Sequence, residues 1–484
     1  MGYFPLQCKN TSGEDVKSMT LNAYKIREGA GRLLTAPVDM ASLAVFRCLF
    51  GLMMTAAMVR FLARGWVTQF YIEPAFHFTY PGFSWVIPWP GHGMHAHFVI
   101  LSLLGLGMAL GFYYRICTFL FFLGFTYIEL LDQTAYLNHY YLISLISGLM
   151  LFLPANRLWS VDAWRKPSIR QATAPAWTLN LLRFQVGVVY FFAGLAKVNA
   201  DWLLRAEPLR LWLSAKSCLP VVGPWLDEVW VAYAASWFGA LFDLGIVFFL
   251  LHLRTRCAAY VLLLGFHAAT GLLFNIGMFP WIMVVGATVF FPADWPRRWL
   301  LKRDGLRSRI YQGPPRVAHP TDESAKAPCP APPFPNGKTS GWIWVLLGLY
   351  VTVQLLLPLR SYFYAEPPAW TGMGFNCAWR VMIAEKTGCV DFYTLNPTTG
   401  RRERLAGKDC LTPRQELMMA QDPDLIRAFA RHLSSELQTP GRAPVPIYAE
   451  AFATMNGRPS QRLIDPAVNL AGQLSSGWIL PLKD

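Results

Sequence analysis

The chain has 484 residues, of which 54% are hydrophobic, 15% aromatic and only 15% charged, and this composition favours a membrane protein over an ordinary soluble enzyme. Its net charge of +14 comes from 43 Lys and Arg in short clusters between apolar runs, a pattern typical of cytoplasmic loops rather than of a nucleic-acid-binding surface. The nine Cys residues form no CxxC pair, which excludes a zinc ribbon and a thioredoxin-type motif.

The first 36 residues are polar and basic, so we expect a cytoplasmic segment without a cleavable signal peptide. Apolar runs near the ~20 residues that cross a bilayer then predict about nine transmembrane helices. Eight belong to a helical membrane domain over residues 37–300, and the ninth covers 341–359. The predicted helices lie near residues 39–62, 95–113, 115–131, 136–154, 179–197, 230–251, 256–274, 277–292 and 341–358.

Charges in the connecting loops predict the orientation of these helices. If the N-terminus is cytoplasmic, the basic loops near Arg115, Arg165, Arg254 and Arg297 all fall inside. The opposite connections are richer in acidic residues: Glu73, Glu129, Asp132, Asp201, Glu207, Asp227 and Glu228. The C-terminus is therefore expected on the outer side of the membrane.

The remaining chain divides into a linker and a small domain. Residues 301–340 are basic and rich in Pro, which predicts a flexible cytoplasmic linker before the last transmembrane helix. Residues 360–484 predict an extracytoplasmic α+β domain, with strands at Val381–Ile383 and Val390–Tyr393, a turn at NPTTG and one amphipathic helix near 413–437. The fold class is thus a mainly α, polytopic membrane protein with a C-terminal α+β domain.

Ionisable groups at membrane depth are costly, so each needs a partner, a wet cavity or a function. Those within or at the ends of the predicted helices are Arg47, Glu129, Asp132, His139, Arg183, Lys197, Asp243 and His267. For Arg47 and Arg183, we expect a structural role, in pairs with Asp243 or with backbone carbonyls.

Lys197 ends the run YFFAGLAK, in which Tyr190, Gly194 and Lys197 share one helix face, with the glycine leaving room beside the amine. Periodicity alone leaves two interpretations. One is a lysine that extends to the outer interface, which spacing favours. The other is a partly buried amine that acts as a general base.

Two further groups suggest a binding site. Asn138 and His139 open the fourth helix beside three Tyr, an arrangement suited to a carbonyl-bearing aromatic ligand but also to an aromatic belt at the membrane interface. His267 and Asn275 lie about two turns apart and are expected to line one cavity, with Gly271 admitting a ligand. The alternative for His267 is a buried histidine bonded to a neighbouring helix.

The stretch GHGMHAH places His92, His95 and His97 close together, but it has no HExxH box and no adjacent carboxylate, so we expect an exposed loop and no metal. The sequence also has no GxGxxG loop, no Walker A motif and no GxSxG elbow, so nothing supports nucleotide-dependent or serine-esterase chemistry.

Several ordered motifs resemble the vitamin K-dependent gamma-carboxylase family, whose membrane part is the HTTM domain. The resemblance runs from about residue 40 to 480 and is strongest over 100–300. The motifs are FRCLFGL (46–52), LGFYYRICTFLFFL (110–123), NHYYL (138–142), NRLWSVD (156–162), YFFAGLAKVNADW (190–202), FNIGMF (274–279), ADWPR (293–297) and RLIDP (462–466).

The resemblance implies an enzyme that oxidises vitamin K hydroquinone, as phylloquinol or menaquinol, with O2 to the epoxide and adds CO2 to glutamate side chains of a protein substrate. It implies that Lys197 is the base, and that Asn138 and His139 position the quinone. A membrane cavity with His267, Asn275 and Tyr190 would complete the cofactor site, without a metal. Trp379 and Arg380 fall in the stretch near which the family receives glutamate.

The chain also departs from animal members of the family. It ends soon after RLIDP, so propeptide recognition is not expected, and residues 63–94 contain no Cys for the family's bridge between lumenal segments. A pair among Cys377, Cys389 and Cys410 remains open. Ala196 replaces a lysine and Arg380 an acidic residue, which favours a shorter, bacterial-type member. Two alternatives remain: a quinol epoxidase without carboxylation, and a non-enzymatic quinone- or lipid-binding scaffold.

Overall fold

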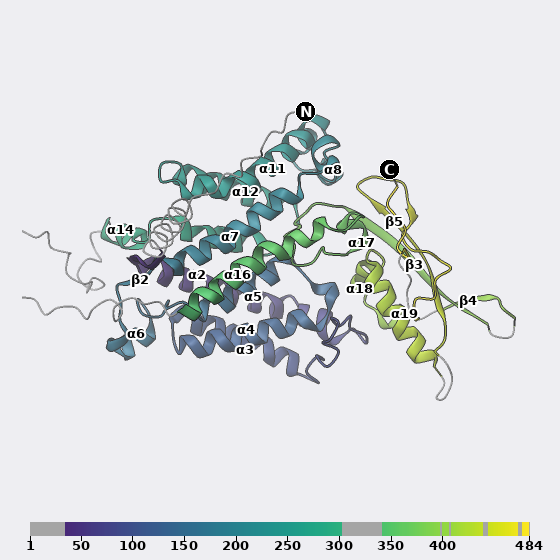
Figure 1. Cartoon of the computed structure of the whole chain (residues 1–484), viewed down its shortest axis with the longest axis horizontal. Coiled ribbons are helices and arrows are strands. Elements are labelled where there is room, and N and C mark those ends of the chain that lie inside the picture. Colours follow the sequence, from purple (N-terminus) through teal and green to yellow (C-terminus); the bar gives the residue numbers. More distant parts are fainter. Residues whose placement is uncertain are drawn as a thin grey trace, which may run out of the picture.

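The computed structural model describes residues 34–302, 341–396, 399–405, 408–438, 444–472 and 477–483. Most of the predicted N-terminal segment (1–36) and of the predicted linker (301–340) lies outside these ranges. Figure 1 shows the described residues in two parts: long helices that run roughly side by side, and a C-terminal domain of strands and shorter helices at one end of them.

Seven described helices are long and apolar enough to cross a membrane, which confirms a mainly α membrane fold. Each matches one predicted segment to within a few residues. They are α2 (Ala41–Ala63), α3 (Gly93–Leu110), α4 (Tyr114–Leu131), α7 (Ala176–Ala196), α11 (Val229–Leu251), α12 (Arg256–Leu273) and α16 (Gly341–Leu359).

The other two predicted segments form shorter helices, α5 (Asn138–Met150) and α13 (Phe279–Ala287). At 1.5 Å per residue, the 13 residues of α5 extend only about 20 Å, less than the ~30 Å of a hydrocarbon core. The count of nine full spans is therefore not confirmed. A polar or irregular segment precedes each of these short helices. The first residues of both helices line one of the cavities described below.

Two arginines, one buried and one half-buried, hold the membrane helices in register through backbone carbonyls. Arg47, completely buried on α2, donates to the carbonyl oxygens of Ala155 at 2.9 Å and Trp159 at 2.6 Å. Arg183 on α7 donates to the Val289 oxygen at 2.8 Å. The predicted structural role of both arginines is confirmed, since both donate to backbone carbonyls. Asp243, the other partner considered, pairs with Lys197.

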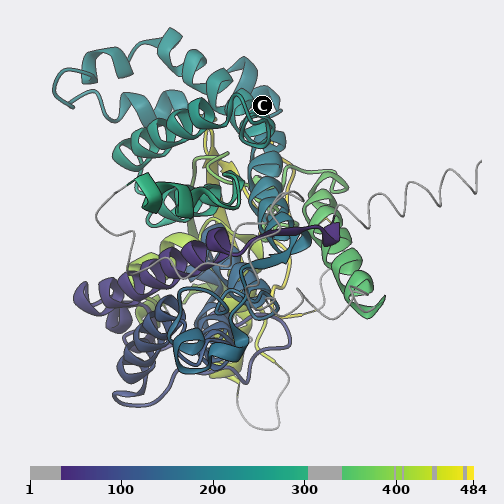
Figure 2. The ribbon, with the colours of Figure 1, turned by 90° about the vertical axis from the view of Figure 1, so that its left-hand side faces the viewer.

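Short elements connect the long helices. Strands β1 (Pro37–Asp39) and β2 (Thr173–Pro175) pair in antiparallel fashion and tie the start of α2 to the start of α7. Figure 2 shows the molecule from the side that lies at the left of Figure 1, with α16 at the edge of the bundle. The remaining short helices are α6 (Val161–Arg165), α8 (Ala200–Leu204), α9 (Leu209–Ser214), α10 (Gly223–Leu226) and α14 (Trp295–Lys302).

The C-terminal domain contains a four-stranded antiparallel sheet of order β4-β3-β5-β6. Alternate residues of β5 are buried, as expected for a strand with one face on a core. That core includes Trp370, Phe392 and Phe429. The elements are α17 (Pro368–Thr371), β3 (Lys386–Leu395), β4 (Arg402–Arg404), α18 (Pro413–Met419), α19 (Pro423–Leu437), β5 (Ile447–Met455) and β6 (Gln461–Arg462).

Two details of the predicted C-terminal domain were wrong. Val381–Ile383 is not a strand, because Met382 adopts a positive φ of 52° and the segment runs along a cavity. The single helix near 413–437 is two helices, since the chain turns at Asp422 and restarts at Pro423, where proline is favoured in a first turn. The predicted strand at Val390–Tyr393 is confirmed within β3, and NPTTG lies between β3 and β4.

Side-chain contacts join the C-terminal domain to the membrane part at several places, of which three bear on the cavities and on the stability of the contact. Arg458 donates to both carboxylate oxygens of Asp201, at 2.7 and 2.8 Å. Gln415 donates to Asp132 at 2.8 Å. Asn138, the first residue of α5, donates to the Arg380 backbone oxygen at 3.2 Å and so fixes the segment that runs past the cavities.

Candidate functional site

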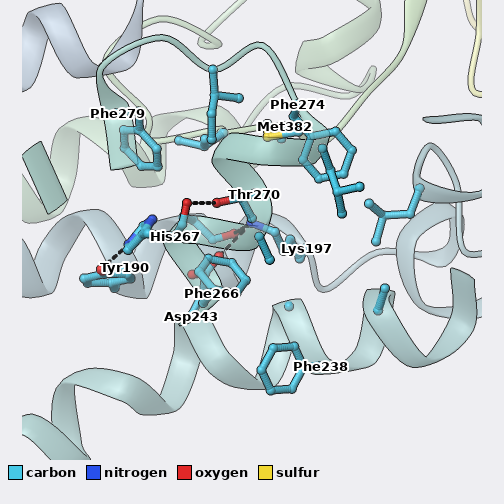
Figure 3. A pocket seen from close by; sticks show the side chains of 18 of the residues that line it. Tyr190, Lys197, Phe238, Asp243, Phe266, His267, Thr270, Phe274, Phe279 and Met382 are labelled. Atoms are coloured by element: carbon cyan, nitrogen blue, oxygen red, sulfur yellow. Dashed lines mark hydrogen bonds and ion pairs between the residues drawn. The ribbon is translucent and has the colours of Figure 1, made fainter. Parts of the chain in front are cut away.

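The first candidate site is a cavity of about 530 Å³ among α7, α11 and α12, which we call the apolar cavity. Its lining is dominated by aliphatic and aromatic side chains, among them Phe238, Phe266 and Phe274, and Figure 3 shows how these side chains surround a few polar groups. Those polar groups include Tyr190, Lys197, Asp243 and His267. A long apolar ligand with a polar head would match this distribution.

Lys197 lies just beyond the last residue of α7, and only 5% of it is exposed. Its ammonium nitrogen is 2.8 Å from Asp243 Oδ2 on α11 and 3.2 Å from the Ala193 backbone oxygen. The side chain therefore stays inside the protein and does not extend to the interface. The sequence singled out both residues but did not predict this pairing, since it offered Asp243 only as one possible partner of Arg47 or Arg183.

Gly194 explains how α7 and α11 bring this pair together. A Cβ at position 194 would lie 2.7 Å from the backbone nitrogen of Leu244, so only glycine permits this approach of the two helices. Leu244 directly follows Asp243, which places the carboxylate opposite the end of α7. The expectation that Gly194 leaves room beside the amine was wrong, since that space is filled by α11.

Tyr190 and His267 form a second polar pair in the same cavity. The Tyr190 hydroxyl is 2.7 Å from His267 Nε2, so the histidine does bond to a neighbouring helix. His267 Nδ1 is also buried, yet it has no hydrogen-bond partner among the described residues. A buried nitrogen without a partner is costly, and a polar ligand atom in the cavity would satisfy it.

The second candidate site is a cavity of about 670 Å³ between α2, α5, α18 and the segment around Arg380. Asn138, His139 and Asn275 line it, so the starts of α5 and α13 border this cavity. Three arginines line it as well, which is why we call it the arginine cavity; they are Arg60, Arg380 and Arg414.

The two cavities share a border of five residues: Phe274, Ile276, Phe279, Val381 and Met382. The Phe279 ring lies between the two histidines, with its centroid 6.3 Å from that of His139 and 6.1 Å from that of His267. His267 and Asn275 therefore line adjacent cavities, and the expectation of one shared cavity was wrong because the chain leaves α12 at Phe274.

Comparison with known protein families shows to which family this chain belongs. Residues 35–295 match the HTTM domain, and residues 339–484 match the lumenal domain of vitamin K-dependent gamma-carboxylase. The chain belongs to the vitamin K-dependent gamma-carboxylase family. No solved structure matches it. The family match and the seven apolar helices together identify this gamma-carboxylase family member as a multi-pass membrane protein. Its family is a family of enzymes.

Arg380 and Trp379, the two residues predicted to lie near the glutamate substrate, have different surroundings in this family member. Arg380 lines the arginine cavity, and burial lowers the pKa of its guanidinium, which nevertheless stays protonated at neutral pH. Trp379 is completely buried, with its ring centroid 5.1 Å from that of Tyr141, and lines neither cavity. Trp379 therefore supports the segment rather than facing a ligand.

The other sequence expectations concern metals and disulfides. His92 is exposed, but His95 and His97 are half-buried in the first turns of α3, so the expected loop is in fact a helix. No group of three potential metal ligands occurs within the residues that the structure describes. Cys377 and Cys389 are free thiols.

Sequence reasoning missed Arg60 and Arg414. Arg60 lies in the last turn of α2, inside a predicted span, and an ionisable group at that depth was a usable signal. Arg414 gave no such signal, because α18 belongs to the C-terminal domain and reaches the cavity only through the folded structure.

Proposed function

We propose that this protein is a vitamin K-dependent gamma-glutamyl carboxylase that couples O2-dependent epoxidation of a naphthohydroquinone to CO2 addition at glutamate side chains. The observation that carries the proposal is the buried Lys197–Asp243 pair on the wall of the apolar cavity. Both family matches support the same chemistry. The apolar cavity is the proposed cofactor site.

The residues present fit such a cofactor. The apolar lining suits an isoprenoid tail, whose burial contributes ~0.8 kcal/mol per CH2. A hydroquinone oxygen would satisfy the unpartnered Nδ1 of His267, with Tyr190 fixing the ring of that histidine from the other side. When bound, vitamin K hydroquinone supplies the electrons that reduce O2 and the strong base that glutamate deprotonation requires.

Lys197 acts in this proposal as the base that takes the hydroquinone proton. A protonated lysine cannot accept a further proton, so Lys197 can act as a base only after it has given its own proton to a partner. Lys197 and Asp243 form an ion pair in the structure, and transfer of the shared proton to Asp243 would turn it into a neutral pair once a bound cofactor has displaced water, because the neutral form avoids two desolvated charges. Asp243 then serves as a positioning residue that both holds the amine and leaves it uncharged.

Asn138, His139 and Asn275 lie beyond Phe279, on the side of the arginine cavity. In the proposed arrangement, they contact the quinone head from that side, and Arg380 faces the glutamate substrate. Quinone and glutamate then meet at the border between the cavities, with little water between them. Exclusion of water protects a strong base from being quenched.

Products of the purified protein test the proposal. Naphthohydroquinone, O2, labelled CO2 and a glutamate peptide are expected to yield both epoxide and labelled peptide. Lys197→Ala is expected to reduce both by about 10²- to 10⁴-fold, the usual contribution of a general base. The matched control is Lys166→Ala, at an exposed lysine that lines neither cavity, which should behave as wild type.

Three results would contradict parts of the proposal. Epoxide without labelled peptide would leave a quinol epoxidase. Wild-type activity in Lys197→Ala would remove the assigned base. Absence of epoxide from the wild-type protein, with bound quinone nonetheless detected, would leave a quinone-binding scaffold.

A further inference from the structure

The arginine cavity holds an unusual concentration of positive charge. Arg60, Arg380 and Arg414 come from α2, from the segment after α16 and from α18, yet all three line one space of about 670 Å³. Neither Asp nor Glu occurs among the described residues that line it. Three cations without an anion in a half-enclosed space repel one another and attract a negatively charged ligand.

Aromatic rings hold two of these arginines without neutralising them. The Arg60 guanidinium carbon is 4.8 Å from the Trp66 ring centroid, and that of Arg414 is 4.4 Å from the Phe70 centroid. The two rings stack on each other, with centroids 6.1 Å apart. Such cation–π contacts fix the position of a guanidinium while its N–H groups remain available for a ligand.

The third arginine is held by different groups. Arg380 NH2 donates to the Ser361 hydroxyl at 3.2 Å, and its guanidinium carbon lies 5.2 Å from the Tyr362 ring. Its Nε is buried and has no hydrogen-bond partner in the part of the chain that the structure describes. Arg458 shows a different arrangement, since its largely buried guanidinium pairs with the carboxylate of Asp201. The three cavity arginines form no such ion pair with any described residue.

We propose that the arginine cavity is a carboxylate site, in which Arg60, Arg380 and Arg414 together bind the acidic side chain of the substrate and prefer it with two negative charges. This inference rests on the proposed function. It assigns to Arg60 and Arg414 a direct role in substrate recognition, and it makes charge the property that selects glutamate over glutamine.

The reaction itself explains why three cations suit this site better than one. Carboxylation replaces a γ-hydrogen of glutamate with a carboxylate: the C–H electron pair forms the new C–C bond to CO2, and the hydrogen leaves as a proton taken by the base. The side chain therefore carries one negative charge before the step and two after it. A site with three guanidinium groups stabilises the charge that develops more than the charge already present.

Binding of short fluorescent peptides to the full-length protein in nanodiscs tests this site directly. Three peptides differ only at one position, which is glutamine, glutamate or γ-carboxyglutamate. We expect glutamate to bind about tenfold more tightly than glutamine, and γ-carboxyglutamate more tightly again, with both differences shrinking at high salt. Equal affinity for the three peptides would overturn the proposal.

Variants identify the groups responsible. Arg60→Gln and Arg414→Gln are each expected to weaken γ-carboxyglutamate binding about tenfold and to affect the glutamine peptide little. Arg60→Lys keeps the charge and should retain most of the discrimination, which shows that the helix end still folds. The control is Arg64→Gln, since Arg64 is exposed at the end of the same helix and lines neither cavity. Wild-type discrimination in both Gln variants would overturn the assignment.

Two further outcomes separate this inference from others. Inorganic phosphate or phosphatidylglycerol that displaces the γ-carboxyglutamate peptide as effectively as unlabelled peptide does would show a general anion site and overturn the carboxylate preference. Epoxide formation by the wild-type protein is measured separately. Charge-dependent peptide binding without epoxide would refute the proposed function and leave the carboxylate site standing, whereas epoxide without discrimination between peptides would do the reverse.

Discussion

The membrane part and the C-terminal domain place their charges in opposite positions. In the membrane part, Arg47, Lys197 and Asp243 are at most 5% exposed, while Leu, Val and Phe side chains face outward. In the described residues of the C-terminal domain, the core is apolar and no charged side chain falls in the buried class. A helix surface in lipid gains nothing from charge, so charges there collect inside, where they bind or react.

The comparison separates two uses of a buried polar group. In the C-terminal domain, a buried Gln or Asn joins elements, as Gln415 and Asn456 do at the contacts with the membrane part. In the membrane part, Arg47 has a similar structural role, but the Lys197–Asp243 pair borders a cavity. A buried charge with a cavity beside it is therefore the better indicator of function.

The largest expected effect comes from breaking the charge pair in the membrane part. Asp243→Ala leaves the Lys197 amine buried without its carboxylate, which typically costs about 3–5 kcal/mol. Thermal unfolding in detergent should show a clear loss of stability, and epoxide formation should fall with it. Asp243→Ala combined with Lys197→Met should recover most of the stability but no activity. If Asp243→Ala alone is as stable as Asp227→Asn, a control substitution at an exposed site, the expected cost of breaking the pair is contradicted.

The next effect concerns the ion pair between the two parts. Arg458→Ala removes two hydrogen bonds to Asp201 and is expected to cost about 1.5–3 kcal/mol. Limited proteolysis and thermal unfolding measure the loosening of the C-terminal domain. Arg401→Ala, at an exposed arginine of the β3–β4 turn, is the control and should have no effect.

The pH dependence of this ion pair sharpens the test. Burial alone would raise the pKa of Asp201, but hydrogen bonds from Arg458 and Asn456 outweigh it and hold that pKa below its ordinary value. A lowered folded-state pKa stabilises the fold above the unfolded value of about 3.9 and loses that effect as pH falls through the folded value. The difference between wild type and Arg458→Ala should therefore be constant from pH 7 to about 5 and shrink below about pH 4.

A smaller effect is expected at the lipid-facing wall of the apolar cavity. Gly265 is exposed on α12 and lines the cavity, and a Cβ there would meet nothing within 4 Å. A leucine at this position would fill cavity space, so Gly265→Leu should raise the KM for a long-tailed naphthohydroquinone about tenfold, or about 1.4 kcal/mol, with a smaller change for a short-tailed one. Gly348→Leu, at an equally open glycine of α16 away from the cavity, is the control; equal effects would remove the quinone from this cavity.

The smallest effect lies in the C-terminal domain, where Asp422 caps α19. Burial, together with the neighbouring charge of Asp424, raises the pKa of Asp422 to about 6. A raised carboxyl pKa means that ionisation at pH 7 opposes folding, and this cost disappears as pH falls from about 6 towards 4.

Asp422→Asn keeps a good cap and removes the ionisation, so we expect a gain of about 1 kcal/mol at pH 7 and none at pH 4, measured by thermal unfolding. Asp422→Ala, which also removes the cap, should lose stability at pH 4. A stability difference between wild type and Asp422→Asn that is the same at both pH values would contradict the raised pKa.

The sequence by itself determined the membrane class, the positions of nine apolar helices and the family. These follow from local properties: runs of apolar residues, helical periodicity and ordered motifs. It also identified Lys197 and His139 as unusual, because a polar residue in an apolar run is visible without a fold. It failed at the chain reversals, where positive φ angles at Met382 and a break at Asp422 replaced the expected strand and helix.

Only the tertiary structure decided which of these residues meet. Asp243 reaches Lys197 because Gly194 lets two helices approach, and nothing in the local sequence of either helix specifies that partner. The arginine cavity joins α2 to α18, more than three hundred residues later in the chain, as the numbers of Arg60 and Arg414 show. Contacts between distant segments depend on how whole helices pack, and periodicity reports only which face of a helix a residue occupies.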